Sequence, residues 1–259
     1  RALIYIEEEM LRHEGAFLTM GITKRYPHIK TRITRGFFSP TNRAPKSIDE
    51  LYNDIDYYPD NYLCRLMHDG INGIWIYTRF SELLPSSYIT EYGHESERRI
   101  AKLNALVKKC ARFGIKVYIF AIEPFFFKDN KELNEKYKDI LGAEIEGGYH
   151  ALCTKTEFVR NYCEEAGEKI CTLVPDIGGW IGITVGEGLT SCVSNIVKTP
   201  CPRCGKQHKG EVLAEAIDVL KSGMRKTNPN AEFISWTYAH RTWEHDDIRE
   251  YVRNAPDDC

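Results

Sequence analysis

The sequence of 259 residues predicts an α/β protein, a partial (β/α)8 TIM barrel with about five βα units that follow a short helical segment. Amphipathic helical patterns end at a glycine and lead directly into short apolar runs, which is typical of βαβ units in a parallel sheet. The most apolar run, 180–186, is flanked by glycines and shows no alternation, as expected for a strand buried on both faces. A chain of this length can form one barrel domain or two smaller domains.

The predicted strands follow one another along the chain with helices between them. The expected strands are 31–38, 71–77, 116–122, 180–186 and 233–238. The expected helices are 61–68, 95–113, 156–174, 211–225 and 244–253, the second of which is the clearest and ends at Gly114. A long excursion, 125–150, follows the third strand and contains a charged helical piece from Lys131 to Lys138. Long loops at the carboxyl end of a strand are usually functional.

The helical pattern at the start of the chain precedes the first strand. We expect residues 1–25 to be the helical tail of a preceding domain or a linker, and residues 26–259 to be the N-terminal and central part of a catalytic barrel. An eight-unit barrel needs about 250 residues for the barrel alone. Five units, with no return to the first strand and no initiator Met, predict that both ends lie inside a longer enzyme.

The composition limits the kinds of molecule that this protein is expected to bind. The formal net charge is −2, from 35 basic and 37 acidic residues that are mixed throughout, which gives no electrostatic footprint for nucleic acid. No apolar run approaches the roughly 20 residues of a membrane span, and the start does not read as a signal peptide. Nine cysteines at irregular spacing predict a reducing cytoplasm. The 15 Tyr, 11 Phe and 4 Trp suit a site that stacks on hydroxylated ligands, and equally an ordinary core.

Catalytic side chains of parallel α/β barrels lie at the carboxyl ends of the strands. The predicted strand ends present Arg79, Glu123, Glu187, Trp236, Tyr238 and His240. Two carboxylates beside an arginine and aromatic rings match the needs of glycosidic-bond hydrolysis, in which one carboxyl group protonates the leaving oxygen and the other stabilises or attacks the oxocarbenium-like centre. Glu187 and Glu123 are therefore the candidate catalytic residues, and the other four are candidate substrate-binding residues.

Each of these residues also has an interpretation without a catalytic role. Glu187 would then be a solvated loop glutamate, and Glu123 would form an ion pair with Arg79 or a lysine. Pro124 by itself explains a sharp exit from the third strand. Arg79 would be a surface arginine, and Trp236 would belong to the core.

A second constellation consists of Cys192, Cys201 and Cys204, of which the last two form a C-x-x-C knuckle. Thiolates at this spacing can share one tetrahedral zinc ion, with Cys153 or His208 as the fourth ligand. Cys153 is expected on the same rim as Cys192, whereas His208 has the nearer spacing. A redox pair and reduced structural thiols are the alternatives. Four protein ligands would make the zinc structural, and no cofactor is expected for catalysis.

The succession of these motifs resembles a group of bacterial proteins of the glycoside hydrolase superfamily, distantly similar to β-N-acetylhexosaminidases of the family 20 type. The motifs, which cover nearly the whole chain, are EEEMLRHEGAFL, KTRITRGFF, GINGIWIY, GIKVYIFAIEP, ALCTKT, GITVGEGLTSC, CPRCGK and EFISWTY. The resemblance implies a (β/α)8 catalytic domain with Glu187 as general acid. Family 20 enzymes have an Asp-Glu pair at this strand end, where this chain has Gly186-Glu187. The departure weakens the acetamido-assisted mechanism, and a retaining mechanism with its nucleophile on a later strand fits as well.

The sequence thus predicts a glycoside hydrolase that acts on a carbohydrate or glycoconjugate, for which the resemblance suggests a β-N-acetylhexosaminide, with Glu187 as acid or acid/base. A different hydrolase on the same barrel is the enzyme alternative, because a fold does not fix its chemistry. A catalytically silent, zinc-braced carbohydrate-binding barrel is the alternative that is not an enzyme.

Overall fold

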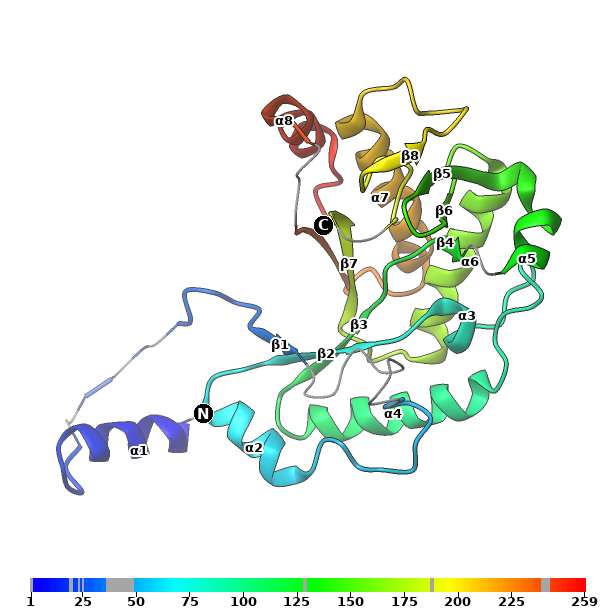
Figure 1. Cartoon of the computed structure of the whole chain (residues 1–259). Coiled ribbons are helices and arrows are strands. Elements are labelled where there is room, and N and C mark those ends of the chain that lie inside the picture. The colour runs from blue at the N-terminus through cyan, green and yellow to red at the C-terminus, as the bar shows by residue number, and fades with distance from the viewer. Residues whose placement is uncertain are drawn as a thin grey trace.

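The computed structural model describes residues 2–18, 21–22, 24, 26–35, 49–127, 130–186, 189–238 and 243–259. Its centre is a curled sheet of parallel strands in the order β1-β2-β3-β7-β9, which is also their order along the chain (Figure 1). The strands are β1 Ile33–Arg35, β2 Gly73–Tyr77, β3 Lys116–Phe120, β7 Gly179–Val185 and β9 Glu232–Thr237. The predicted partial barrel is confirmed, and all five predicted strands are present. Residues 36–38 of the first predicted strand lie outside the described residues.

Helices connect the parallel strands and cover one face of the sheet (Figure 1). They are α2 Asp60–His68, α3 Phe80–Leu83, α4 Ser96–Ala111, α6 Glu157–Leu173 and α7 Lys209–Thr227. Helix α4 buries Leu103, Val107 and Cys110 on its sheet side, and the chain leaves it through Gly114, whose φ of +66° favours glycine. The Thr156 hydroxyl caps α6 by accepting the Val159 N–H at 3.4 Å, as its place before the helical pattern predicts.

The two faces of the parallel sheet have different neighbours. On one face, strand residues such as Ile74, Val117 and Trp180 belong to the main core, together with side chains from the helices. On the other face, Tyr118, Phe120, Ile181 and Ile183 form a separate small cluster, which contains only residues from the strands and their ends. Since side chains alternate along a strand, this second face is the barrel interior, and no described helix packs on it.

A second, antiparallel sheet stands beside the carboxyl ends of β3 and β7, in the order β4-β6-β5-β8 (Figure 1). Its strands are β4 Phe125–Phe127, β5 Leu141–Ile145, β6 Tyr149–Leu152 and β8 Val197–Thr199. This sheet was not predicted from the sequence, because its strands are only three to five residues long and both pairings of β5 contain irregularities. The charged helical piece is α5 Lys131–Lys136, and a single 3-10 turn, Lys138–Ile140, leads from it to β5.

Two further helices lie near the ends of the described chain. Helix α1 Ala2–Arg12 forms in the predicted N-terminal segment, and α8 His245–Asn254 packs against α7. Gly210 lies where α7 contacts α8. A Cβ atom at this position would lie only 2.5 Å from the Asp247 carbonyl oxygen, so glycine allows the two helices to pack closely. Among the residues that the structure describes, no helix is both long and apolar enough to cross a membrane.

Candidate active site

The carboxyl ends of β2, β3, β7 and β9 meet at one edge of the parallel sheet, because neighbouring parallel strands point the same way. Arg79 follows the end of β2, Glu123 follows β3, and Trp236 and Tyr238 stand at the end of β9. The structure therefore brings these four predicted residues to one edge of the sheet, where Arg79, Trp236 and Tyr238 form a rim and Glu123 is buried beneath it. Glu187 and His240, the other two predicted site residues on the strand ends, lie outside the described residues.

Aromatic rings form a continuous strip on the helix-free face below this rim, which we call the aromatic strip (Trp75, Tyr77, Phe120, Trp236 and Tyr238). Successive ring centroids lie 4.4 Å apart for Trp75–Phe120, 6.1 Å for Tyr77–Phe120, 6.3 Å for Phe120–Trp236 and 5.2 Å for Trp236–Tyr238. Trp236 is 40% exposed and Tyr238 is 49% exposed. The strip thus ends in two rings whose surface is available to a ligand.

Three residues of the strip, namely Trp75, Tyr77 and Phe120, were not predicted from the sequence as site residues. The signal for them is the period of two in the strands, since 75 and 77 point to one face, as do 118 and 120. The interior of a complete barrel is usually filled by branched aliphatic side chains, so a run of aromatic rings there is distinctive.

Arg79 is the basic group of this rim. Its side chain is half-buried, and its Nε donates a hydrogen bond to the Tyr77 hydroxyl oxygen at 3.2 Å. Burial by itself lowers the pKa of Arg79, but the hydrogen bond to Tyr77 and the charges of Glu82 and Glu123 raise it overall. Arg79 therefore stays cationic, and it is anchored to the aromatic strip instead of extending freely into solvent.

Glu123 occupies a different setting from the one that the sequence suggested. Its side chain is 4% exposed, and Oε1 accepts a hydrogen bond from the Phe80 N–H at 3.0 Å, at the start of α3. Burial raises the pKa of Glu123 to about 7, against the opposing effects of the Phe80 N–H and the Arg79 charge. Glu123 thus has the pKa of a proton donor near neutrality, but its carboxyl group lies beneath the rim and supports the segment that carries Arg79.

The chain on both sides of Glu187 is held by hydrogen bonds. Before it, Gly186 has a φ of +121°, which favours glycine, and its N–H donates to the Ser194 carbonyl oxygen at 2.7 Å. The Val185 carbonyl oxygen accepts the Tyr238 N–H at 3.1 Å. Glu187 follows Val185 by two positions in the sequence. It therefore comes shortly after a backbone group that is hydrogen-bonded to Tyr238, at one end of the aromatic strip.

After Glu187, residues 189–194 form a turn whose side chains are all buried. The Thr190 hydroxyl donates to the Ile183 carbonyl oxygen at 2.7 Å, and the Ser191 and Ser194 hydroxyls hydrogen-bond to each other at 2.9 Å. Trp243 Nε1 donates to the Val193 carbonyl oxygen at 2.9 Å. Because its buried polar groups are paired, the turn is fixed from within, as buried hydroxyls require.

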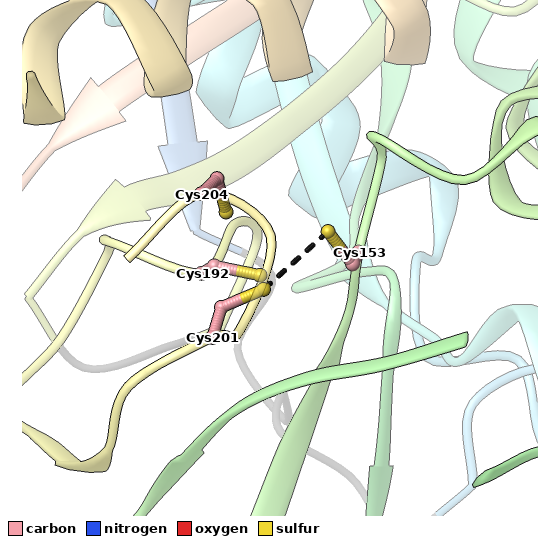
Figure 2. A group of neighbouring side chains, drawn as sticks. All are labelled: Cys153, Cys192, Cys201 and Cys204. Atoms are coloured by element: carbon pink, nitrogen blue, oxygen red, sulfur yellow. Dashed lines mark hydrogen bonds between the residues drawn. The ribbon is translucent and has the colours of Figure 1, made fainter. Parts of the chain in front are cut away.

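Four cysteines converge in the core, one of them within this turn (Figure 2). The sulfur atoms of Cys153, Cys192, Cys201 and Cys204 all lie within 4.8 Å of one another, and all four residues are buried. The Cys153 and Cys201 sulfurs are 3.6 Å apart, so they are thiols and not a disulfide. We call this group the cysteine cluster. Its donor set and its arrangement fit a metal ion of the tetrahedral thiolate type.

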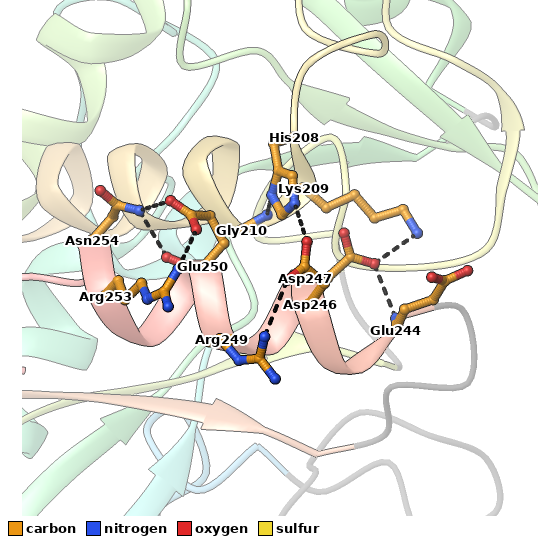
Figure 3. Close-up of polar contacts among 10 residues, drawn as sticks. All are labelled: His208, Lys209, Gly210, Glu244, Asp246, Asp247, Arg249, Glu250, Arg253 and Asn254. Carbon is orange, nitrogen blue, oxygen red and sulfur yellow. Dashed lines mark hydrogen bonds and ion pairs between the residues drawn. The ribbon is translucent and has the colours of Figure 1, made fainter.

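The structure decides between the two fourth ligands that the sequence left open. His208 caps α7, and its Nδ1 accepts the Gly210 N–H at 3.2 Å. Its Nε2 lies 3.6 Å from an Asp246 carboxylate oxygen on α8 (Figure 3). His208 therefore belongs to the contact between α7 and α8, and Cys153 completes the cysteine cluster.

No known family model matches the chain, and no curated protein matches it in sequence. Similar solved structures include the exo-β-1,4-mannosidase Op5Man5 from Opitutaceae bacterium strain TAV5, at 12% identity over 69% of this chain and 28% of that one, with a TM-score of 0.35. Two α-galactosidases also resemble it. The one from Thermus thermophilus has 12% identity over 81% of this chain and 38% of its own, with a TM-score of 0.44. The one from Lactobacillus brevis has 10% identity over 80% and 27%, with a TM-score of 0.48.

This chain thus spans well under half the length of each of these three proteins. With TM-scores below 0.5 and identities of 10–12%, they define neither its fold nor its chemistry. The fold rests on the strand order, and the chemistry rests on the residues of the rim.

Proposed function

We propose that the chain belongs to the catalytic barrel of a glycoside hydrolase, which cleaves a glycosidic bond in a carbohydrate or glycoconjugate. The observation that carries this proposal is the aromatic strip, which ends in the half-exposed rings of Trp236 and Tyr238. It lies on the helix-free face at the carboxyl ends of parallel strands, beside the chain that leads into Glu187. That is where (β/α)8 enzymes hold their substrates.

In this proposal the two exposed rings support the apolar face of a sugar ring, and the arginine at the rim contacts its hydroxyl groups. Aromatic faces offer large contact area at little conformational cost. The hydrogen bond from Arg79 Nε to the Tyr77 hydroxyl oxygen fixes the direction of the planar guanidinium group at the rim. His240 is a further candidate contact, since it follows Tyr238 by two positions.

We assign the role of general acid to Glu187. Its carboxyl group would give a proton to the oxygen of the leaving sugar as the bond to the anomeric carbon breaks, and water would then complete hydrolysis. We place Glu123 in a positioning role, because its buried carboxylate holds the backbone of Phe80 directly after Arg79. A β-N-acetylhexosaminide is the substrate to test first. Since Gly186 stands where family 20 enzymes have an Asp, this substrate is the finer and separate part of the proposal.

A carbohydrate-binding barrel without catalysis is the second candidate. It is favoured by the burial of Glu123, which removes one of the two predicted carboxylates from the rim. The aromatic strip and Arg79 would still bind a sugar in that case. The two candidates differ in one observable, because only the enzyme turns over a substrate that the strip binds.

The experiment compares Trp236→Ala with Val252→Ala in the full-length protein, on a panel of aryl glycosides that includes the N-acetyl-β-hexosaminide. Val252 is an exposed apolar residue on α8 and serves as the matched control. We expect Trp236→Ala to raise KM about tenfold, which corresponds to about 1.4 kcal/mol of lost stacking, and Val252→Ala to leave it unchanged. Sugar binding by wild type without turnover of any glycoside would favour the binding barrel. A KM of Trp236→Ala equal to that of wild type would contradict the proposed site.

A further inference from the structure

The cysteine cluster takes no part in the proposed reaction. Three separate segments supply it: Cys153 follows β6, Cys192 lies in the buried turn after β7, and Cys201 and Cys204 follow β8. Figure 2 shows their side chains turned toward one another from these segments. Because these three segments are separated in the sequence, the four buried thiols lie together only in the folded chain.

We propose that the cysteine cluster binds one Zn²⁺ ion as a structural site. A tetrahedron with Zn–S bonds of about 2.3 Å requires sulfur–sulfur distances of about 3.8 Å. The observed sulfurs are 3.6 Å apart for Cys153 and Cys201 and within 4.8 Å for every pair, so small side-chain rotations bring them to that distance. On binding, each thiol gives up its proton and becomes a thiolate ligand, with no change of oxidation state. Four protein ligands leave no position for substrate or water.

The backbone around the cysteine cluster has features that allow the four thiols to lie close together. At Gly142 in β5 a Cβ atom would overlap the Cys192 sulfur, so only glycine lets that thiol approach. Gly205 donates its N–H to the Cys201 carbonyl oxygen at 2.9 Å and closes the C-x-x-C knuckle. Arg203, inside the knuckle, donates from Nη1 to the Leu141 carbonyl oxygen at 2.8 Å and so ties the knuckle to β5.

The site joins the antiparallel sheet to the chain that carries Glu187. Cys192 stands five positions after Glu187, and Ser194 in the same turn accepts the Gly186 N–H. On the other side, the Cys153 N–H donates to the Ile140 carbonyl oxygen at 2.9 Å, just before β5. A metal bound here thus fixes the segment after β7 to β5 and β6, whatever reaction the rim performs.

Metal content of the full-length protein tests the proposal without reference to activity. We expect about one zinc per chain by elemental analysis after growth and purification with zinc and a reductant. Cys201→Ser/Cys204→Ser should lose it, whereas Cys171→Ala, a buried cysteine of α6 outside the cluster, should keep it. Cobalt(II) exchanged into wild type should give the visible bands of tetrahedral thiolate coordination.

Gly142→Ala extends the test to a variant that keeps all four thiols. We expect its zinc to exchange with a chelator at least tenfold faster than wild-type zinc, because the added Cβ displaces the Cys192 sulfur. Gly182→Ala in β7, where a Cβ makes only ordinary contacts at 3.6 Å, is the matched control. Wild type without zinc and with four freely titratable thiols, iron in place of zinc, or a disulfide among the four cysteines would each overturn the proposal.

Discussion

The aromatic strip and the cysteine cluster lie at the same end of the parallel sheet but differ in access to solvent. Trp236 and Tyr238 are 40% and 49% exposed, whereas all four cysteines are buried. An exchanging ligand can reach the strip, because these two rings are partly exposed. The four cysteines are buried by the residues around them, so the cluster suits a ligand that stays. One region is therefore suited to turnover and the other to stability, and the turn at 189–194 connects them.

Among the changes predicted for the aromatic strip and the cysteine cluster, removal of the metal from the cluster should have the largest effect, and that effect is on stability. We expect a zinc chelator to lower the melting temperature of wild type by about 10 °C or more, because a structural zinc contributes several kcal/mol to folding. The same chelator should not shift the melting temperature of Cys201→Ser/Cys204→Ser. An unchanged wild-type melting temperature after measured loss of zinc would show that the cluster does not stabilise the fold.

Glu123 provides a second comparison between exposed and buried groups, because its carboxyl group is buried beneath the exposed end of the aromatic strip. With a folded-state pKa of about 7 and an ordinary unfolded value of 4.5, the folded protein binds the extra proton between these pH values. Wild type should therefore lose stability as the pH rises from about 4.5 to about 7, by about 3 kcal/mol from this group. Glu123→Gln has no such proton to lose.

The measurement for Glu123 is urea denaturation of wild type and Glu123→Gln at pH 5 and pH 8. The variant should gain stability relative to wild type at the higher pH. Glu146→Gln, in an exposed turn, controls for the loss of a carboxylate. A difference between wild type and Glu123→Gln that does not change with pH would contradict the account of this carboxyl group.

Arg79→Lys should give a smaller effect, confined to substrate binding. Lysine keeps the charge but loses the planar fork that contacts Tyr77 and, in the proposal, the sugar hydroxyls. We expect KM to rise about fivefold, by about 1 kcal/mol, with kcat little changed. Steady-state kinetics on the best aryl glycoside measure this. A change in kcat alone would place Arg79 in the chemical step instead.

The parallel sheet could be predicted from sequence because its signals are local. Apolar runs such as 71–77 follow a helix and a glycine, and that order by itself defines a βα unit. The antiparallel sheet could not be predicted, since β4 and β8 have three residues each and their pairing depends on contacts distant in sequence.

The candidate site, too, could be predicted from the sequence only in part. The strand-end rule brought Arg79, Trp236 and Tyr238 to one rim from sequence alone. The burial of Glu123 was not visible, because its partner Phe80 lies 43 positions away and meets it only in the folded chain. The choice of Cys153 over His208 likewise needed the fold, since spacing along the chain favoured the histidine.

The central claim is that the rim performs general acid catalysis through Glu187. Its most direct test is the turnover number of Glu187→Gln in the full-length protein, on the aryl glycoside that wild type hydrolyses fastest. We expect kcat to fall by about two orders of magnitude or more, with folding and zinc content intact, as the loss of a general acid predicts. A kcat within a few-fold of wild type would remove Glu187 from the reaction and contradict the proposed mechanism.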